Sequence, residues 1–542
     1  MDRRRARRLT KTLHGEIARA MDGLRIKGHK RPHFLSHLLR HREEWRIQGS
    51  FGALTEDQHS VRRSSLCDVR VGSYRRDQVR EGGLSANSTE LESYDLVSLP
   101  IGGDSAGFLH GLWRLTEAKY REACDDFLHK RAVALNYLEA GSGLGALERR
   151  PPERAFRFTN PPEFDRDGYR DYVLRGSRLF KRYPLLRDGH VRVRGTNATR
   201  IFVSSEGAEV VETSVYRAVE LSLWFLAADG HALPYAETFF VRDDQELPSV
   251  EALGARLRTL YARLDALAKA PRLRSYVGPV LLDPGPAGLL VHEAIGHRLE
   301  GSRLLSEGEG QTFRDAAGQR ILMGGIDIWD DPSMRYHDGQ SLTGHYEYDD
   351  EGVPASKATL VEDGVLQGFL TTRSPIEKRH QSNGHARSAH HARAISRMGV
   401  TVMKAREGLD DGAMRRAFLD EIRRQGVPFG VRIASASGGE TTTEAYDFQA
   451  FLGQVDVATR VFPDGREELV RGVDVVGTPL NAVRAIIAAS ERQGVDNAWC
   501  GAESGYVPVS TIAPSLLVDE LELQSKPMRK MTQFAYPMPW EK

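Results

Sequence analysis

Cysteine is scarce in this sequence of 542 residues, where it occurs only as Cys67, Cys124 and Cys500. An odd and sparse set of this kind argues against the disulfide framework of a secreted domain and favours a reducing compartment. Long apolar runs are also missing, because no segment approaches the roughly 20 residues that span a membrane. No apolar stretch follows the N-terminal arginines, as a secretory signal would require. We therefore expect a protein of a reducing compartment without a membrane-spanning segment.

An excess of charge of one sign is missing as well. The 75 basic and 74 acidic residues give a formal net charge of +1, so the chain has no overall field that would attract nucleic acid. The N-terminal run MDRRRARRLTKTLH is locally basic. We interpret this run as a solvated helix start or a frayed terminus, and contact with nucleic acid or an acidic partner is the alternative.

The composition that remains is that of a globular protein with two domains. Hydrophobic residues make up 40% and charged residues 27% of the chain, which is long for a single core. Alternating apolar residues predict strands of a half-buried sheet at 67–71 and 191–194. Spaced apolar residues predict helices at 106–139 and 250–269, and Pro271 would end the second one. We therefore predict an N-terminal domain, residues 1–270, of mixed α and β structure with an antiparallel sheet.

The sequence changes character after Pro271. A short buried strand is predicted at 280–282, followed by a helix that Asp283 would cap and that would continue into His292. Further on, glycine-containing turns separate apolar runs and predict hairpins at 358–370 and 458–470. A late helix is predicted at 481–492. The expected fold class is α+β, and the second domain, residues 271–542, would be rich in strands and carry the helix of the next motif.

That motif is HEAIGH, which starts at His292 and ends at His297. Two neutral imidazoles can each give a nitrogen to zinc, and Glu293 beside the first one offers a carboxylate that can take a proton from water. The familiar HExxH spacing places both histidines on one helix face, whereas the longer interval found here separates them by roughly 140° on a regular helix. Both imidazoles can therefore reach one ion only if the helix bulges or ends near Gly296. Chance occurrence of the motif in a surface helix is the alternative.

Two histidines leave a catalytic zinc site one protein ligand short. Cys500 is a candidate because it lies in the sequence NAWCG, which indicates a loop just after a helix, although a small buried hydrophobe is an equal alternative. Cys67 and Cys124 fit that second description. Other candidates for a ligand or a substrate contact are Glu300, His345 and three histidines near residue 390, while the acidic run 349–351 indicates a turn. Solvated positions in a loop are the favoured interpretation of the three histidines. The three histidines are His385, His390 and His391.

Four stretches of this sequence resemble the TldD/PmbA peptidases, and in particular their metal-bearing TldD-like branch. They are GPVLLDPGPAGLLVHEAIGHRLEGS, GHYEYDDEGVPASKATLVEDGVLQGFL, VFPDGREELVRGVDVVGTPLNAVRAI and WCGAESGYVPV, and they cover most of residues 275 to 515. The resemblance implies zinc ligands at His292, His297 and Cys500 and a catalytic residue at Glu293. It also implies an α+β fold, a cytoplasmic location, flexible or unfolded peptide substrates, and dimers, often with a metal-free PmbA-like chain. The C-terminal sequence SKPMRKMTQFAYPMPW differs from the family's usual small-residue end, which leaves the choice of partner open.

We therefore expect a zinc-dependent peptidase that hydrolyses unfolded or flexible peptides bound in an extended conformation. A homodimer or a heterodimer with a PmbA-like chain is expected, without nucleic acid or membrane as a partner. Two alternatives remain at this point. One is a non-catalytic partner or scaffold subunit, against which the intact HEAIGH motif argues, and the other is a zinc hydrolase that acts on a different amide.

Overall fold

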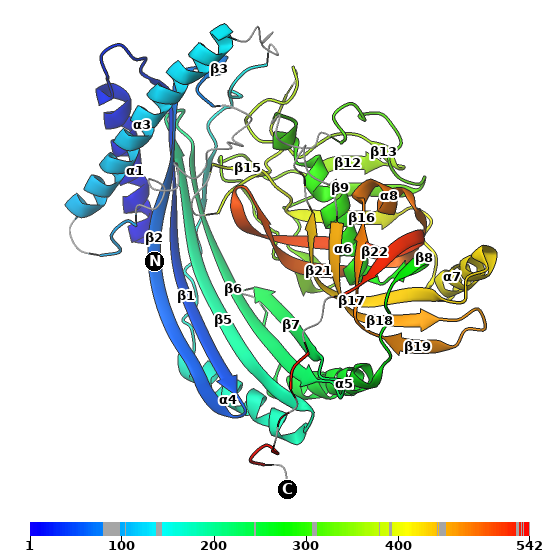
Figure 1. Ribbon diagram of the computed structural model, residues 1–542. Helices are drawn as coiled ribbons and strands as arrows, with labels where there is room; N and C mark the ends of the chain where they lie inside the picture. The colour runs from blue at the N-terminus through cyan, green and yellow to red at the C-terminus, as the bar shows by residue number, and fades with distance from the viewer. Residues whose placement is uncertain are drawn as a thin grey trace.

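The structure is a computed structural model and describes residues 1–79, 98–102, 105–136, 144–242, 245–305, 312–378, 380–389, 393–441, 443, 451–526, 530–532, 534 and 536–540. Two sheets organise these residues (Figure 1). The first is formed by the N-terminal half of the chain and the second by the C-terminal half. The fold class is α+β, as predicted. The predicted division into two domains at residue 270 stays a prediction.

The first sheet is built from long strands that run the height of the molecule (Figure 1). Its order is β3-β2-β1-β5-β6-β4, with β7 also paired to β6, and every pairing except β4 with β6 is antiparallel. The predicted strands at 67–71 and 191–194 lie inside β2 and β5. The strands are β1 (Pro32–Ser50), β2 (Ala53–Ser73), β3 (Arg76–Asp77), β4 (Arg154–Arg157), β5 (Leu186–Ser204), β6 (Glu209–Leu226) and β7 (Ala232–Arg242).

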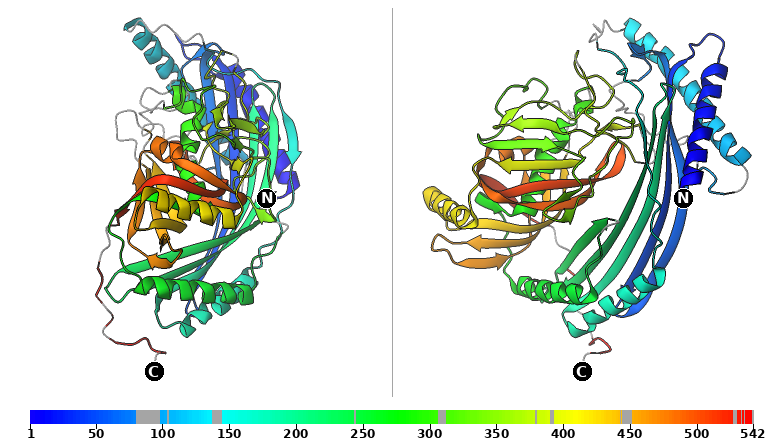
Figure 2. Two further views of the ribbon diagram at one scale, coloured as in Figure 1. Left: turned by 90° about the vertical axis from the view of Figure 1, so that its right-hand side faces the viewer. Right: turned by 180° about the vertical axis from the view of Figure 1, so that it is seen from behind.

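In the part of the chain that the structure describes, helices cover one face of this sheet. Alternate residues of each strand point to opposite faces, so each strand gives one set of side chains to the helices and another to the opposite side. In β1, Leu35, Leu39 and Ile47 face the helices, and the cores that they join contain the buried residues of α1, α3 and α5. The opposite face carries Arg40 and Arg42 and looks toward the C-terminal half (Figure 2). The helices are α1 (Arg3–Gly23), α3 (Ser105–Asn136), α4 (Arg166–Arg178), the 3-10 turn η2 (Leu179–Arg182) and α5 (Val250–Lys269). Helix α5 matches its prediction, whereas residues 137–139 of the other predicted helix lie outside the described residues.

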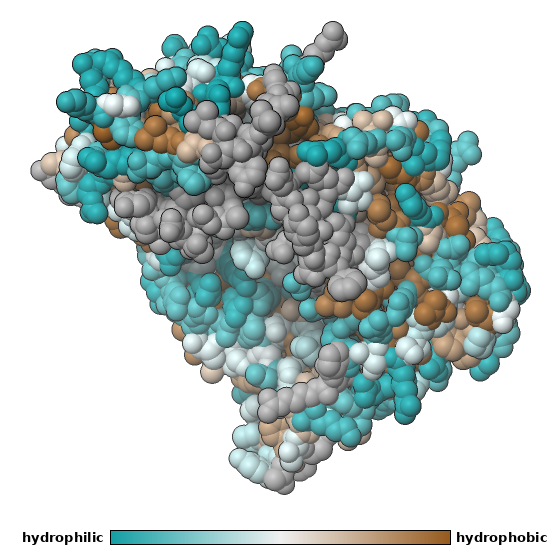
Figure 3. All heavy atoms as spheres, turned by 45° about the horizontal axis from the view of Figure 1, so that its top comes forward, coloured by the Kyte–Doolittle hydropathy of each residue, from teal (hydrophilic) through white to brown (hydrophobic). Residues whose placement is uncertain are grey.

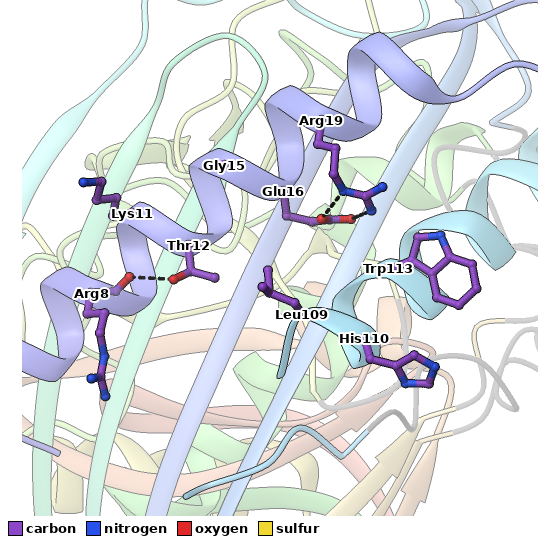
Figure 4. A pocket seen from close by; sticks show the side chains of 9 residues that line it. All are labelled: Arg8, Lys11, Thr12, Gly15, Glu16, Arg19, Leu109, His110 and Trp113. Carbon is purple, nitrogen blue, oxygen red and sulfur yellow. Dashed lines mark hydrogen bonds and ion pairs between the residues drawn. The ribbon is translucent and has the colours of Figure 1, made fainter. Parts of the chain in front are cut away.

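The basic N-terminus forms helix α1, whose apolar side packs on the sheet while most of its arginines are exposed. A groove of about 710 Å³ separates α1 from α3 and is bordered by Arg8, Lys11 and Trp113 (Figure 4). Glu16 in its wall is buried and forms an ion pair with Arg19 at 2.6 Å. The surface over these two helices is mainly hydrophilic (Figure 3). The prediction of a solvated helix start is confirmed.

The second sheet has the order β13-β12-β9-β16-β22-β20-β18-β17-β8, with β19 paired to β18 and β21 to β22. Strand β8 also pairs with β22. The hairpins predicted at 358–370 and 458–470 correspond to β12–β13 and β18–β19. The strands are β8 (Tyr276–Leu282), β9 (Ile326–Asp330), β12 (Ala358–Glu362), β13 (Val365–Leu366), β16 (Val400–Ala405), β17 (Gly430–Thr441), β18 (Phe451–Val461), β19 (Glu467–Val470), β20 (Val473–Gly477), β21 (Ile486–Ala502) and β22 (Gly505–Ser525). Two short pairs lie beside it, β10 (Tyr336–His337) with β11 (Gln340–Ser341) and β14 (Ala386–Arg387) with β15 (Ile395–Ser396).

Among the described residues, five helical segments accompany this sheet, and the one that carries the metal motif packs on it directly. Helix α6 joins β8 and β22 in the largest buried cluster of this half. Asp283 occupies its N-cap position, as predicted, but its carboxylate forms an ion pair with Arg432 at 2.9 Å instead of a capping bond. The segments are α6 (Pro284–Ala294), η3 (Gly296–Leu299), η4 (Gly301–Leu305), α7 (Asp411–Gln425) and α8 (Pro479–Arg484).

The helix predicted at 481–492 is wrong for most of its length. Helix α8 ends at Arg484, and strand β21 begins at Ile486. The apolar spacing of IIAAS fits either a helix or a buried strand, and pairing with β22 decides for the strand. In the described part of the chain, no helix is long and apolar enough to cross a membrane.

Candidate metal centre

The two histidines of the motif converge because the α-helix ends between them. Helix α6 stops at Ala294, Ile295 leaves regular helical geometry with φ −116°, and residues from Gly296 continue as a 3-10 turn. The imidazole centroids of His292 and His297 are consequently 4.9 Å apart, with their planes at 86°. Both side chains are buried. The predicted helix end near Gly296 is confirmed.

Cys500 completes the group from a strand. It lies near the end of β21, paired with Val507, so the predicted loop after a helix is wrong. Its Sγ is 3.2 Å from His292 Nε2 and 3.3 Å from His297 Nε2. The three donor atoms all lie within 4.8 Å of one another. The structure thus brings together the three side chains that the sequence proposed as ligands.

The charges in this group favour a thiolate. Burial by itself would raise the pKa of Cys500, but the positive imidazoles of His297 and His292 and their hydrogen bonds lower it to about 4. Burial opposes protonation of His297 as well, yet Glu300 and the thiolate raise its pKa to about 10. A thiolate is the form of cysteine that binds metals, and a metal would displace protons from the imidazoles.

The donor set fits a zinc ion. With the usual bond lengths, tetrahedral zinc holds a sulfur and a nitrogen ligand about 3.5 Å apart, close to the distances of 3.2 and 3.3 Å between Cys500 Sγ and the two imidazoles. Two imidazoles and one thiolate are donors that zinc binds well. Three protein donors would leave zinc a fourth position for water. All three residues line a cavity of about 940 Å³.

Glu293 lines the same cavity but stands beside the donor group. Its side chain lies against β17, where a Cβ on Gly439 would come within 3.0 Å of Glu293 Cγ. Burial raises the pKa of this carboxyl group above its ordinary value, although the two imidazoles oppose the shift. A carboxylate with a raised pKa is a better proton acceptor at neutral pH.

Glu300 holds the second histidine in place. Its Oε2 is 3.1 Å from His297 Nδ1 and accepts a hydrogen bond from Arg303 Nε at 3.0 Å. Arg397 Nε pairs with the other oxygen at 3.3 Å, and its Nη2 donates to Cys500 Sγ at 3.1 Å. All these groups are buried. Glu300 therefore holds the His297 ring in one orientation, and it also binds Arg397, which places a positive charge beside the Cys500 sulfur.

We expect Glu300→Gln to weaken zinc binding by about 10–100-fold, the usual effect of removing an outer partner of a ligating histidine. The amide keeps the size of the side chain but leaves Arg303 and Arg397 without their shared negative charge. Competition with a chromogenic chelator measures the affinity. Glu421→Gln is the matched control, since Glu421 is also buried and bound to an arginine, but on α7. Equal affinities of the Glu300 variant and the wild type would contradict this role.

Gly296 is required for packing. A Cβ at this position would lie 2.1 Å from Met398 Sδ, and Met398 is buried next to Arg397. We expect Gly296→Val to weaken zinc binding without removing a ligand, and to cost about 1–3 kcal/mol of stability through overpacking. Thermal melts and chelator competition measure both effects. In Gly288→Ala, a control in the preceding helix α6, the new Cβ would meet Thr511 Cγ2 at an ordinary 3.5 Å. Shortening the opposing side chain with Met398→Ala should restore zinc to the Gly296 variant, and failure of this rescue would reject the packing explanation.

The other sequence candidates lie outside the donor group. His385 is fully buried and pairs with Asp330 at 3.2 Å, so the favoured interpretation of a solvated loop histidine is wrong for this residue. His345 is bound to the carbonyl oxygen of Pro332, and burial lowers its pKa to about 4. His390 and His391 lie outside the described residues. The acidic run 349–351 forms a turn, as predicted.

Sequence reasoning named Glu300 only as a substitute ligand and missed Arg397 altogether. The spacing of three residues between His297 and Glu300, typical of neighbours on one helical turn, could have indicated contact. Arg397 comes from the segment after β15 and meets Cys500 across 103 residues of sequence. No pattern of neighbouring residues in the sequence predicts this contact between Arg397 and Cys500.

These observations define a class: an α+β protein whose second sheet and adjoining helix hold a buried cluster of two imidazoles and one thiol. The comparisons add a family resemblance. Residues 275–525 match the PmbA/TldA metallopeptidase C-terminal domain, and this part of the chain is similar to proteins of the TldD/PmbA family.

Relatives cover part of the chain. A metalloprotease of Archaeoglobus fulgidus is 31% identical over 242 residues, which are 44% of this chain and 51% of the relative. A zinc metalloprotease TldD homolog of Saccharolobus solfataricus is 26% identical over 324 residues, or 59% of this chain and 68% of the relative. The chain thus spans about half to two thirds of the length of these relatives. The structure of TldE from Thermococcus kodakarensis shares the fold, with a TM-score of 0.59 at 12% identity, covering 95% of this chain and 100% of that one.

Proposed function

We propose that this protein is a zinc-dependent peptidase of the metal-bearing TldD-like branch. The observation that carries the proposal is the buried group of His292, His297 and Cys500 beside Glu293 at the wall of a cavity. The family match supports it, as does the similarity to a relative named a zinc metalloprotease. An intact donor set argues against the alternative of a non-catalytic scaffold subunit.

In this proposal, His292, His297 and Cys500 hold the ion, which supplies Lewis-acid chemistry by polarising a carbonyl group and making water easier to deprotonate. Glu293 takes the proton from the attacking water and returns it to the leaving amine. Arg397 donates a hydrogen bond to the Cys500 sulfur, and Glu300 orients His297. The burial of these groups excludes bulk water from all but the open side.

Peptides in an extended conformation are the proposed substrates. Residues 436–441 of β17 pair with β18 only, and residues 496–502 of β21 pair with β22 only, as far as the described residues show. Both segments line the cavity of the metal centre. A flexible peptide can therefore add its backbone to a free strand edge, which gives affinity without a strong sequence requirement. A zinc hydrolase acting on another amide is the alternative.

We also propose a cytoplasmic dimer, either of two copies or with a PmbA-like chain. The family resemblance motivates this assembly, and the exposure of Trp499 (59%) and Tyr506 (71%) beside the metal-centre cavity supports a covering partner or substrate. Light scattering of the pure protein, alone and with a PmbA-like chain, tests it. A monomer under both conditions that cleaves folded proteins would reject the assembly.

The test of the function is zinc analysis of the purified protein together with mass spectrometry of a library of unstructured peptides. We expect about one zinc per site and cleavage that stops after chelation and returns with added zinc. A fully loaded protein that leaves every peptide intact would reject the peptidase, and a library of other amides would then test the alternative.

A further inference from the structure

A second cavity, of about 650 Å³, lies between the uncovered face of the first sheet and the C-terminal half of the chain. In Figure 1 this is the region where β1, β5 and β6 face β21. It shares four lining residues of the β21–β22 hairpin with the cavity of the metal centre: Asn497, Ala498, Trp499 and Tyr506. A chain bound at the metal centre can therefore extend into this second cavity.

The lining of the second cavity is rich in positive charge. Among the described residues it contains nine arginines and six carboxylates, whereas the whole chain carries a net charge of only +1. Four of these arginines form ion pairs with carboxylates of the same wall, and they are Arg40, Arg157, Arg194 and Arg200. The excess of positive charge is thus local, and two buried arginines of the wall form hydrogen bonds with main-chain carbonyl oxygens instead.

Arg242, at the end of β7, is one of these. It is buried, with 5% of its surface exposed. Its hydrogen bonds come from Nη2 and end on main-chain carbonyl oxygens, of Leu342 at 2.7 Å and of His345 at 3.4 Å. Its Nε has no partner in the part of the chain that the structure describes. The guanidinium lies over the ring of Tyr216 at 5.2 Å, which leaves it held in position but not neutralised.

Arg387 is the second such group. It is buried, donates to the carbonyl oxygen of Met398 at 2.6 Å and lies 4.9 Å from the ring of Tyr346. The carboxylates that influence it most, Asp350 and Asp330, are bound to other donors. Arginine stays charged in proteins, and a buried charge without a counter-charge is unfavourable. Arg242 and Arg387 both line the cavity. An anion that enters it therefore meets two guanidinium groups that are not paired with a carboxylate among the described residues.

We propose that the second cavity binds a carboxylate of the substrate, with Arg242 as its principal partner and Arg387 as the second cation. Acidic peptides are then the preferred substrates. This inference rests on the proposed peptidase function. The carboxylate can come from a glutamate or aspartate side chain or from the C-terminus of the peptide. Guanidinium groups suit either source, because their donors match the geometry of a carboxylate.

The fold sets the distance between this carboxylate and the scissile bond. The segment that Arg242 contacts is fixed to β21, since Thr343 donates its main-chain N–H to Asn497 Oδ1 at 3.0 Å. Asn497 lies three residues before Cys500, which is roughly 10 Å along a strand. An acidic group about three residues from the cleaved bond is therefore expected to bind best.

The experiment uses the full, zinc-loaded chain carrying Glu293→Gln, so that binding is read without cleavage. Fluorescence anisotropy compares three labelled, flexible ten-residue peptides at low salt. One has a single glutamate and an amidated C-terminus, one has glutamine in its place, and the third is the glutamine peptide with a free C-terminal carboxylate. We expect one of the acidic peptides to bind at least about tenfold more tightly than the neutral one. The tighter of the two identifies the source of the carboxylate, and equal binding of all three overturns the proposal.

Variants then locate the site. Arg242→Gln should reduce the preference to less than about threefold while the neutral peptide keeps its affinity, and Arg242→Lys should retain part of the preference. Arg194→Gln is the matched control, because it removes the same charge from the same wall at a residue paired with Glu220. Equal loss in the control would show a diffuse field and overturn the assignment. If Arg242→Gln does not fold, Arg387→Gln must lower the preference, and an unchanged preference there overturns the proposal.

Two further outcomes are decisive. An oligothymidylate of ten nucleotides that binds more tightly than the acidic peptide would show that the cavity selects nucleic acid and would overturn the peptide assignment. Hydrolysis by the wild-type protein without any preference for acidic peptides would reject this inference alone. Binding of acidic peptides by a protein that hydrolyses none would instead reject the proposed function and leave the anion site standing.

Discussion

Cys500→Ala is expected to lower zinc affinity by at least about 100-fold, because loss of a ligand should exceed the 10–100-fold effect of losing an outer-sphere partner. The thiolate supplies one of three donors and balances part of the positive charge of the ion. Its removal also leaves Arg397 without the sulfur that it contacts at 3.1 Å. Zinc bound after dialysis against a chelator, measured by elemental analysis, gives the result. Cys500→Ser should retain some metal, since the hydroxyl is a weaker donor.

The two remaining cysteines provide the controls for this experiment. Cys67 and Cys124 are buried in the core around α3 and the first sheet, far from the metal centre in the fold. Cys67→Ala and Cys124→Ala should therefore keep full zinc and lose about 1–3 kcal/mol of stability through packing alone. If Cys500→Ala keeps stoichiometric zinc and full activity, the proposed ligand set is wrong. Glu300, already 3.1 Å from His297, would then be the first substitute to test.

Glu293→Gln is expected to lower peptide cleavage by about 10²–10⁴-fold while zinc stays bound, because the carboxylate is proposed to carry a proton and not to bind the ion. The amide has nearly the same shape, so its contact with Gly439 is preserved. Cleavage of an unstructured peptide and zinc content are measured on the same sample. Zinc content and cleavage rate distinguish a metal ligand from a proton carrier. Loss of zinc would show that Glu293 is a ligand, and an unchanged cleavage rate would remove Glu293 from the mechanism.

Glu468→Gln is a suitable control for the same assay. Glu468 lies on β19 and pairs with Arg460, so the substitution removes one carboxylate without touching the metal-centre cavity. Its turnover should equal that of the wild type. A comparable loss of activity in this control would show that the assay responds to general charge or stability.

The local sequence was enough to predict the elements whose structure depends only on residues close along the chain. The leucine stripe of 250–269 and the stop at Pro271 specify α5, because a helix of this length presents one apolar face whatever it packs against. The HEAIGH interval required a break near Gly296, and the 3-10 turn supplies it. The same reasoning failed for residues 486–492, where a run of apolar residues fits two periods and only pairing with β22 selects one.

The sequence by itself therefore determined the kind of chemistry: two histidines, a glutamate and a short list of possible third donors. Tertiary structure decided which donor meets them. Cys500 reaches His292 across 208 residues of sequence because β21 is paired to β22, on which α6 packs. Arg397 and Arg242 acquire their positions in the same way, through contacts between distant segments. Such contacts depend on how whole elements pack against one another, and no spacing along the chain encodes that packing in a form that can be read locally.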